Sequence, residues 1–414
     1  YEERARRLEI YKDIIKEKAH TDARSISLLT KSAQQMTLRC LKKNSDTRMK
    51  IALVLMPWYR RESPSPELAM TTSILKKKNR EVQVWDISAL MFRDTFMKRR
   101  YWKHFLLDAD SETIENFQEQ AKEFFEYYSN KILTHNPDII IFKCIGNSYY
   151  NSERLARIIK ESDKDKIVIF TGLLTSSAHD VETIAARQNE MPVDFIICGE
   201  DYFALDELLK AVETGEASKL ESIFEKKGKI INCAKGPIIE NLDDLPFFDF
   251  SGFDLNCYRF PDVFEIFISK GCPWRCAFCI DWQNEKFRSM SGKRILNEIL
   301  NLSHSYKIKH IRFCDKTING NIKALDEFCD LFLDALNKGL FKGSGEFGWS
   351  GDAMIRPEMT KGLLEKMFLA RFYGIGYGLE SGSEKVIREM GKLFSMPLAE
   401  EVIRNTHLAQ IKTS

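Results

Sequence analysis

The sequence predicts an α/β protein built from two successive series of parallel strands and helices. Short, continuous apolar runs alternate with helical stretches between residues 50 and 215, as expected of a doubly wound parallel sheet whose strands are buried on both faces. A second alternation of the same kind begins at Val263. The composition agrees with this class, because 44% hydrophobic and 29% charged residues are ordinary values for a globular chain with sizeable cores.

The first series contains five expected strands and has the strand–helix order of a Rossmann-type sheet. A typical strand is the uninterrupted apolar run Ile51–Met56, which is ended by a loop rich in proline and arginine. The expected strands cover residues 51–56, 82–87, 138–143, 167–171 and 195–198, and the expected helices cover a stretch ending near residue 77 and residues 112–134, 151–161, 178–188 and 202–212.

Two regions without this alternation flank the first series. Residues 1–49 are expected to form a helical segment, because their apolar residues recur on one helical face and charged residues fill the rest. Residues 216–260 are expected to be a linker, because their turn-forming residues and prolines show no period. The first predicted domain therefore spans residues 50–215.

The second series, residues 261–414, has the strand–helix order of a (β/α) barrel. Its four or so βα units are fewer than a closed barrel contains, so we expect a partial barrel that is incomplete at its C-terminal end. The expected strands cover residues 264–268, 310–314, 346–350 and 371–379, and the expected helices cover residues 292–306, 322–337, 360–369 and the region after residue 383.

Composition and charge exclude several classes of partner. A net charge of +2 on 414 residues gives no overall reason to expect binding to nucleic acid or to an anionic membrane. No apolar run reaches the ~18 residues that a membrane span needs, and no apolar signal core follows the first residues. We therefore expect a cytoplasmic protein, in which the ten cysteines are reduced thiols and clustered ones are metal ligands.

Three cysteines are clustered on one short loop that follows a buried strand. Cys272, Cys276 and Cys279 have the spacing C-x3-C-x2-C. Soft thiolates favour iron–sulfur assembly, so three of them can hold three irons of a [4Fe–4S] cluster and leave the fourth iron open for a chelating molecule. A structural zinc or a closed cluster would need a fourth ligand, and none stands at a recognisable spacing. Zinc, a closed cluster and three buried structural cysteines remain the alternatives.

The loop resembles that of the radical S-adenosylmethionine superfamily. Gly271–Cys279 has the family's cysteine spacing, with an aromatic residue before the last cysteine. The stretches Arg356–Met359 and Gly374–Ser383 resemble the third- and fourth-strand signatures of the subgroup with an N-terminal cobalamin-binding domain. The resemblance implies a flavodoxin-like first domain followed by a partial radical S-adenosylmethionine barrel, with the open iron chelating the amino and carboxylate groups of S-adenosylmethionine.

Several residues acquire roles by this resemblance. Phe278 would lie beside the adenine, and Glu380, at the carboxyl end of a barrel strand, would contact the amino or ribose groups of S-adenosylmethionine. Ser350 and Arg356 flank the third strand as candidate cofactor contacts. The simpler alternatives are a helix-capping role for Glu380 and a surface position for Arg356. Asp315, after the second strand, is either a polar residue facing substrate or part of a plain loop.

The same resemblance implies that residues 50–215 bind cobalamin at the carboxyl ends of their strands. No D-x-H-x-x-G motif occurs, which excludes a histidine lower ligand from that motif, and Asp201 stands where the family usually has a glycine. The alternative is a domain that only packs on the barrel or recognises substrate. The candidate cobalamin contacts are Asn147, Gly172, Leu173, Gly199 and Glu200.

The resemblance implies an enzyme that cleaves S-adenosylmethionine reductively to a 5′-deoxyadenosyl radical and, with cobalamin, methylates an unactivated carbon. The alternatives are a radical rearrangement or oxidation, with or without cobalamin, and a non-catalytic iron–sulfur protein. The substrate is expected to be a small molecule or a peptide. A flavodoxin- or ferredoxin-type electron donor is implied as a partner, and neither a membrane nor nucleic acid is expected.

Overall fold

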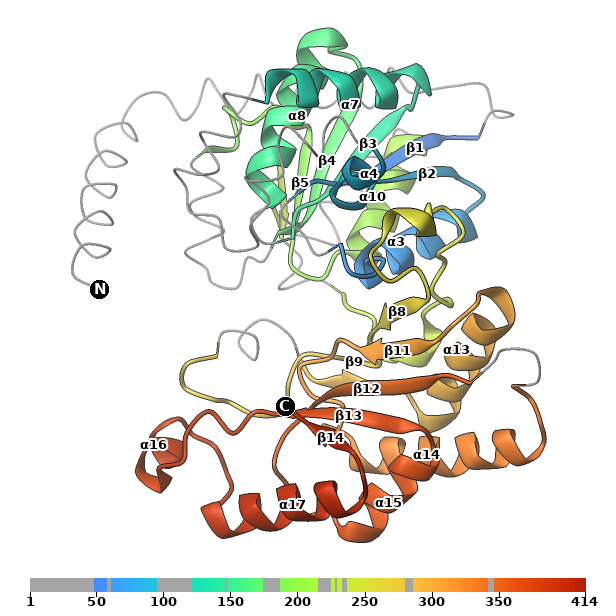
Figure 1. Cartoon of the computed structure of the whole chain (residues 1–414). Helices are drawn as coiled ribbons and strands as arrows, with labels where there is room; N and C mark the ends of the chain where they lie inside the picture. Colours follow the sequence, from blue (N-terminus) through green and yellow to red (C-terminus); the bar gives the residue numbers. More distant parts are fainter. Residues whose placement is uncertain are drawn as a thin grey trace.

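A computed structural model of the chain describes most of both predicted domains (Figure 1). The described residues are 48–57, 61–94, 121–145, 148–173, 187–214, 225–227, 229–232, 237–279, 286–341 and 346–414. The expected N-terminal helical segment, most of the expected helix 178–188 and the part of helix 112–134 before residue 121 lie outside these ranges. No helix in the described part of the chain is long and apolar enough to cross a lipid bilayer.

The first sheet has seven strands in the order β2-β1-β3-β4-β5-β7-β6. The first five follow the 2-1-3-4-5 order of flavodoxin-like folds and are all parallel, which confirms the predicted doubly wound sheet. β7 continues the sheet parallel to β5, and β6 is antiparallel to β7. The strands are β1 Lys50–Leu55, β2 Glu81–Asp86, β3 Ile139–Lys143, β4 Ile167–Leu173, β5 Phe195–Cys198, β6 Glu225–Lys227 and β7 Ile230–Asn232.

Helices cover both faces of this sheet, as Figure 1 shows. Apolar side chains of α3 and α10 form one core with one face of the strands, and those of α7 and α8 form another core with the opposite face. This two-sided burial explains the continuous apolar runs of β1 and β3 in the sequence. The helices are α3 Pro66–Lys77, α4 Ile87–Arg93, α7 Lys122–Thr134, α8 Ser148–Ser162 and α10 Tyr202–Thr214.

The predicted linker contains more structure than its sequence indicates. Strands β6 and β7 lie within it, and two short 3-10 helices follow, η3 Leu242–Asp244 and η4 Leu255–Cys257. Each element has only three residues, which is too short to show a periodic pattern. The segment also holds the two sheets together, because the Tyr258 hydroxyl donates to Asp86 of β2 at 2.6 Å while the Phe248 amide donates to Glu298 of the second domain at 3.0 Å.

The second sheet has five strands, and four of them lie in the order β8, β11, β12, β13 from one edge, all parallel. A two-residue strand, β14, adds to β13 and is too short to have been predicted. The strands are β8 Val263–Ile266, β11 His310–Phe313, β12 Gly348–Ala353, β13 Phe372–Tyr377 and β14 Lys412–Thr413. The helices are α13 Gly292–Ser305, α14 Ile322–Asn337, α15 Lys361–Leu369, α16 Glu384–Glu389 and α17 Met396–Leu408.

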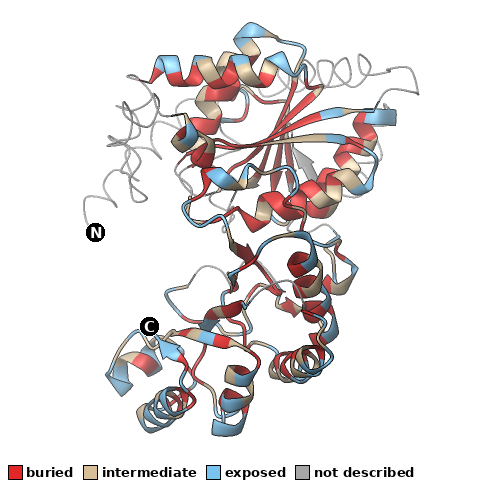
Figure 2. Cartoon of the chain, turned by 45° about the vertical axis from the view of Figure 1, so that its right-hand side comes forward, coloured by how far each residue is buried: buried red, intermediate tan, exposed pale blue. Residues whose placement is uncertain are grey.

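Aromatic packing holds the helices on one face of the second sheet. Trp349 of β12 is fully buried, and its ring lies 4.3 Å from that of Phe372 and 5.1 Å from that of Phe328, measured between centroids. Its indole N–H donates to the Ala370 carbonyl at 2.6 Å, which satisfies the one polar atom of the side chain. Buried residues run along both sheets while the outer helix faces are exposed (Figure 2).

We predict that Trp349→Ala lowers the free energy of unfolding of the second domain by about 3–5 kcal/mol, because it removes a large buried ring and leaves the Ala370 carbonyl unpaired. Urea unfolding followed by circular dichroism would measure this change. The control is Leu393→Ala, at a side chain that is 83% exposed, which is expected to change the free energy by less than about 0.5 kcal/mol. Equal effects of the two substitutions would contradict the assignment of Trp349 to the core.

Candidate functional site

The three clustered cysteines lie on a loop at the carboxyl end of the second sheet. β8 ends at Ile266, a short strand β9 (Ser269–Lys270) follows, and the loop begins immediately after it. β9 pairs with β10 (Arg288–Ser289) in a two-stranded antiparallel ribbon. The carboxyl ends of parallel strands are where α/β folds place their ligands.

The cysteine side chains suit an iron–sulfur cluster. Cys276 is buried, Cys272 and Cys279 are half-buried, and none of the eight described cysteines forms a disulfide. The Cys279 amide donates to the Cys276 carbonyl at 3.0 Å, which folds this part of the loop into a tight turn. Within the described ranges no three His, Cys, Asp or Glu side chains converge on a single metal-ion position. In an open [4Fe–4S] cluster each thiolate binds a different iron, so the three need not converge.

Asp315 anchors the start of the loop. Its buried carboxylate accepts hydrogen bonds from the Ile268 amide at 3.0 Å, from the Ser269 amide at 2.5 Å and from the Ser269 hydroxyl at 2.5 Å. Burial raises the pKa of Asp315 to about 6, against the lowering effect of these hydrogen bonds. Asp315 therefore has a role that neither expectation named: its carboxylate holds the start of the cysteine loop in place.

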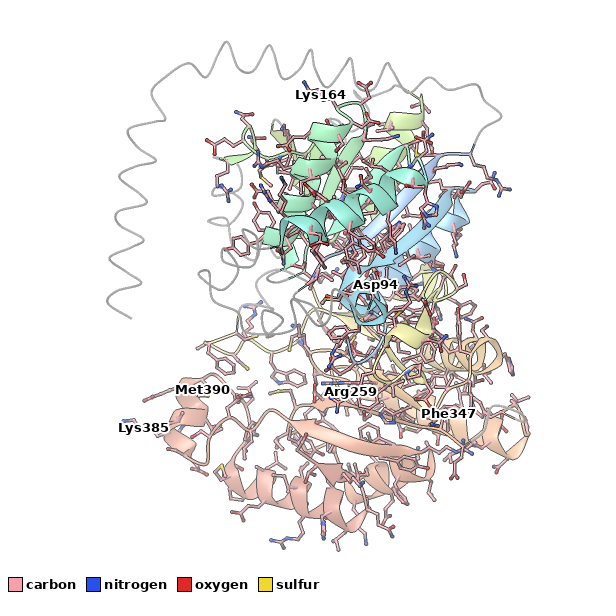
Figure 3. All side chains as sticks on the ribbon, turned by 45° about the horizontal axis from the view of Figure 1, so that its top comes forward. Asp94, Lys164, Arg259, Phe347, Lys385 and Met390 are labelled. Carbon is pink, nitrogen blue, oxygen red and sulfur yellow. The ribbon has the colours of Figure 1, made fainter. Side chains whose placement is uncertain are left out.

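The end of α16 anchors the other half of the loop. The Ala277 amide donates to the carbonyl of Met390 at 2.8 Å; Met390 is labelled in Figure 3. Gly391 follows with a φ of +75°, and a Cβ at this position would lie 3.3 Å from the Arg275 carbonyl oxygen. A left-handed backbone and this close approach favour glycine here.

Lys392 brings two of the predicted cofactor contacts together. Its buried ammonium donates to the Gly378 carbonyl at 2.5 Å and lies 3.5 Å from the Glu380 carboxylate. The same nitrogen lies 5.7 Å from the centroid of the Phe278 ring, which is 57% exposed. Burial raises the pKa of Cys276, and the charge of Lys392 acts in the opposite direction and favours the thiolate. Phe278, Glu380 and Cys276 thus share one neighbour, Lys392.

Glu380 has an unusual backbone conformation. Its φ is +65°, a left-handed value that costs a non-glycine residue about 1 kcal/mol or more. The carboxylate is 42% exposed and has Lys392 as an ion-pair partner. The helix-capping alternative has no support in the described hydrogen bonds, because Ser383, the residue before α16, makes no side-chain cap and Glu380 is not among the capping groups. A role for Glu380 in contacting S-adenosylmethionine stays a prediction.

Ser350 and Arg356 have other partners in the described structure. The Ser350 hydroxyl lies 2.7 Å from Nε2 of His310, within the sheet. The Arg356 guanidinium pairs with Glu358 at 2.8 Å, donates to the Asn319 carbonyl at 2.6 Å and lies 5.2 Å from the Trp274 ring centroid. Arg356 therefore supports the cysteine loop through Trp274 and is not a simple surface arginine. Direct contact of either residue with a cofactor stays a prediction.

The predicted cobalamin contacts are only partly described. Asn147 and the side chain of Leu173 lie outside the described residues. Gly172 and Gly199 have φ values of +72° and +92°, so both strand ends turn with left-handed glycines. Glu200 forms a bidentate ion pair with Arg288 of the ribbon, and both side chains are less than a tenth exposed. Glu200 therefore contacts the second domain, and its contact with cobalamin stays a prediction.

A buried ion pair lies at the carboxyl ends of β3 and β4 in the first sheet. The Lys143 ammonium, at the end of β3, lies 2.5 Å from the Asp201 carboxylate. The hydroxyl of Thr171, the register partner of Lys143 on β4, also donates to Asp201. Asp201, which departs from the family's glycine, is therefore the counter-charge of Lys143.

The described part of this edge fits a bulky ligand in one respect. The left-handed glycines at the ends of β4 and β5 place no side chain at these two positions. No histidine stands among the described residues that follow β1, β3, β4 and β5, so these residues would hold cobalamin through backbone and packing contacts. The loops 58–60, 146–147 and 174–186 lie outside the described residues.

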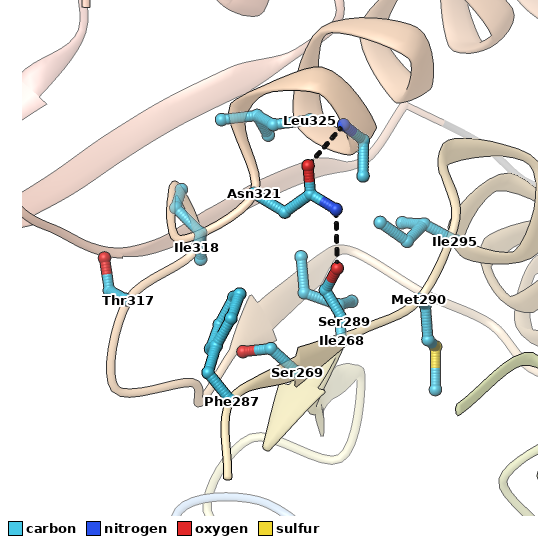
Figure 4. A pocket seen from close by; sticks show the side chains of 11 residues that line it. Ile268, Ser269, Phe287, Ser289, Met290, Ile295, Thr317, Ile318, Asn321 and Leu325 are labelled. Atoms are coloured by element: carbon cyan, nitrogen blue, oxygen red, sulfur yellow. Dashed lines mark hydrogen bonds between the residues drawn. The ribbon is translucent and has the colours of Figure 1, made fainter. Parts of the chain in front are cut away.

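A small pocket lies between the ribbon and the first turn of α14 (Figure 4). Ile268, Ser289 and Asn321 are among its lining residues, and it has space for about one water molecule. The Asn321 side chain donates to the Ser289 hydroxyl at 2.8 Å across it. The pocket is too small for a cofactor, so we assign it to the packing that supports the ribbon.

Apart from Lys143, the basic residues of this site have no signal in the sequence pattern. Lys392, Lys143, Lys270 and Arg288 are buried or nearly so, yet each is an ordinary lysine or arginine in the sequence. Lys143 was the one detectable case, because it ends an apolar strand run where a charge is unusual. The others follow from tertiary contacts and have no local signal.

Solved structures with the same architecture identify the fold. A radical S-adenosylmethionine methyltransferase, TsrM of Kitasatospora setae, superposes with a TM-score of 0.62 at 13% identity, over 88% of this chain and 66% of that chain. The cobalamin-dependent S-adenosylmethionine radical enzyme OxsB superposes with a TM-score of 0.61 at 16% identity, over 93% of this chain and 54% of that chain. The chain has the fold of cobalamin-dependent radical S-adenosylmethionine enzymes. This result confirms the predicted fold class.

Curated proteins also match the chain in sequence. An uncharacterized methyltransferase of Pyrococcus horikoshii is 25% identical over 264 residues, 62% of this chain and 54% of the relative. The anaerobic magnesium-protoporphyrin IX monomethyl ester cyclase of Rubrivivax gelatinosus is 25% identical over 233 residues, 53% of this chain and 40% of the relative. The chain thus spans about half the length, or less, of these relatives. No protein-family model matches the chain.

We predict that Cys276→Ala abolishes assembly of a complete cluster, because each loop thiolate is expected to bind a separate iron. Anaerobic reconstitution followed by iron and sulfide analysis would measure the loss. Cys314→Ala is the matched control, since this nearby thiol donates to the Ile266 carbonyl at 3.2 Å and is not on the loop. Loss of the cluster in Cys314→Ala would instead indicate a fourth cysteine ligand and a closed cluster.

We also predict that Lys392→Met weakens binding of S-adenosylmethionine by about 10- to 100-fold, the range seen when a residue that orients ligands of a metal site is lost. The reason is that Glu380 and the Gly378 carbonyl lose their common buried partner. The change in the electron paramagnetic resonance spectrum on titration with S-adenosylmethionine would give the affinity. Lys385→Met, on the exposed face of α16, should behave as the wild type.

Proposed function

We propose that this chain is a radical S-adenosylmethionine enzyme that, together with cobalamin, methylates an unactivated carbon. The single observation that carries the proposal is the loop with Cys272, Cys276 and Cys279, set at the carboxyl end of a radical S-adenosylmethionine sheet beside Glu380 and Lys392. When bound, a [4Fe–4S] cluster would supply the electron that cleaves S-adenosylmethionine to methionine and a 5′-deoxyadenosyl radical, and cobalamin would supply the methyl group.

The residues of the chain would bind and orient these groups. The three thiolates would hold the cluster, and Phe278 would lie against the adenine. Glu380 carries the negative charge that suits the amino group of S-adenosylmethionine. The buried Lys392 fixes the position of the Glu380 carboxylate through their ion pair. Gly172, Gly199 and the neighbouring loops would hold the corrin at the carboxyl edge of the first sheet.

Radical oxidation or rearrangement is the second candidate. It is favoured by the cyclase relative, which matches nearly as much of this chain as the methyltransferase does. The common part of both candidates is the reductive cleavage of S-adenosylmethionine. The fate of the substrate radical separates them, because only the first candidate yields a methylated product.

The chemistry also implies a partner and a compartment. A flavodoxin- or ferredoxin-type protein would supply the electron, and the substrate would be a small molecule or a peptide. None of the eight described cysteines forms a disulfide, and an oxygen-sensitive cluster requires reducing conditions, so we place the protein in the cytoplasm.

The proposal is tested by anaerobic reconstitution with iron and sulfide, followed by dithionite, S-adenosylmethionine and hydroxocobalamin. We expect 5′-deoxyadenosine to form and corrin absorbance to remain on the desalted protein. Deoxyadenosine without retained corrin would contradict the cobalamin part alone. If the protein holds a complete cluster but forms no deoxyadenosine with candidate substrates present, the proposal that it is a radical S-adenosylmethionine enzyme is contradicted. The Cys276→Ala variant is the control for cleavage that does not depend on the cluster.

A further inference from the structure

The cysteine loop is tied to the first domain through the ribbon that precedes it. β9 and β10 pair so that Lys270 lies directly opposite Arg288. Only Gly271 separates Lys270 from Cys272 in the sequence. Both basic side chains form ion pairs with carboxylates of the first domain, Lys270 with Glu67 and Arg288 with Glu200.

The Lys270 contacts form a compact network of charges. Its ammonium lies 2.8 Å from one oxygen of Glu67 and 3.3 Å from the Tyr202 hydroxyl, and that hydroxyl donates to the other oxygen of Glu67 at 2.6 Å. Desolvation would raise the pKa of Glu67, but the ammonium groups of Lys270 and Lys143 outweigh it and lower the pKa to about 2. Glu67 is therefore ionised, and Tyr202, whose pKa burial raises, is a neutral donor.

The far end of the network reaches the carboxyl edge of the first sheet. Lys143 of β3 lies 4.0 Å from the second oxygen of Glu67 and 2.5 Å from Asp201, which directly precedes Tyr202. Thr171 of β4 contacts the same Asp201. A chain of direct polar contacts therefore runs from the ends of β3 and β4 to the residue that enters the cysteine loop.

Burial distinguishes these pairs from ordinary surface ion pairs. The side chains of Arg288 and Glu200 are 5% and 8% exposed, and those of Lys270 and Glu67 are 12% and 30% exposed. A nearby pair at the edge of the ribbon, Lys286 with Glu240, is 66% and 65% exposed at a similar distance of 2.9 Å. Exposed ion pairs contribute little to the stability of a protein. Removing one partner of a buried pair is strongly destabilising, because the other charge is then buried without a partner.

We propose that Lys270 and Glu67 are positioning residues that set the geometry of the cysteine loop from the first domain. This inference rests on the proposed cluster. Buried ion pairs add little net stability compared with apolar packing, so the expected effect of the network is on position. The network fixes the position of the loop relative to the strand ends where cobalamin would bind. A structural change in the first domain would then alter the geometry of the cluster site.

The test changes a residue that lies in the other domain and does not touch the loop. Glu67→Gln removes the negative charge that pairs with the Lys270 ammonium at 2.8 Å, and we expect it to shift the electron paramagnetic resonance spectrum of the reduced cluster. We also expect it to weaken S-adenosylmethionine binding by about 2- to 30-fold, the range of coupling between distant sites. The matched control is Glu213→Gln, a first-domain glutamate that pairs with Arg80 at 2.8 Å, away from the ribbon.

The second variant tests whether the two residues act together. Lys270→Met should give the same spectral change as Glu67→Gln, and the double variant should be no worse than either single one. Lys286→Met, at the exposed pair, should match the wild type. Additive effects of the two substitutions, or a spectrum in Glu67→Gln like that of the wild type, would overturn the inference while leaving the proposed function intact.

A third measurement does not need the cluster. Amide hydrogen exchange of residues 268–279 in the cluster-free protein should be faster in Glu67→Gln and Lys270→Met than in the wild type and both controls. If the wild type assembles no cluster, the proposed function fails and this exchange alone decides the inference. Unchanged exchange in both variants would then overturn it.

Discussion

The structure depends on holding one short loop, which has no regular secondary structure of its own, at the point where two sheets meet. The loop contains the three thiols, and a free loop of this kind would sample many conformations at an entropic cost of about 1–2 kcal/mol for each residue that must be fixed. Three separate attachments offset this cost: Asp315 at its start, the Met390 carbonyl at its middle and Lys270 on its first-domain side. Each attachment comes from a different element.

The attachments are polar, although they lie in a poorly solvated place. Asp315 and Lys392 are buried, and the structure provides each with several partners. Unpaired buried charge costs several kcal/mol, so such groups persist only where the surrounding backbone donates or accepts hydrogen bonds. A cluster with bound S-adenosylmethionine is itself charged, and fixed dipoles and charges around it act without reorganisation when the charge distribution changes. The same groups that order the loop would therefore also set the electrostatics of the site.

Much of the fold could be predicted from the sequence because long apolar runs and strong helical periods identify their own environment. The five strands predicted for the first sheet and the four predicted for the second lie within one or two residues of the expected positions, apart from the strand expected at 346–350, which begins and ends a few residues later. The strands β6, β7 and β14 could not be predicted, since two or three residues show no period. Their positions follow from tertiary packing, where Ile230 and Ile231 fill gaps against neighbouring strands.

The site divides in the same way. The cysteine spacing is a local signal and identified the loop, and the glycine-rich strand end identified Glu380. The partners of these residues are distant in the sequence: Lys392 follows a helix, Asp315 follows another strand, and Glu67 belongs to another domain. Glu200 and Arg356 had predicted cofactor roles, and in the structure each has an ion-pair partner. The partner of Glu200, Arg288, could not be predicted, because an ion pair between distant segments has no local signature in either of them.

The central claim is that the three-cysteine loop holds an open cluster whose free iron binds S-adenosylmethionine. The most direct measurement is the electron paramagnetic resonance spectrum of the reduced, reconstituted protein before and after addition of saturating S-adenosylmethionine. Binding at the open iron predicts a clear change in the g values of the [4Fe–4S] cluster. A complete four-iron cluster whose spectrum is unaffected by S-adenosylmethionine would contradict the claim.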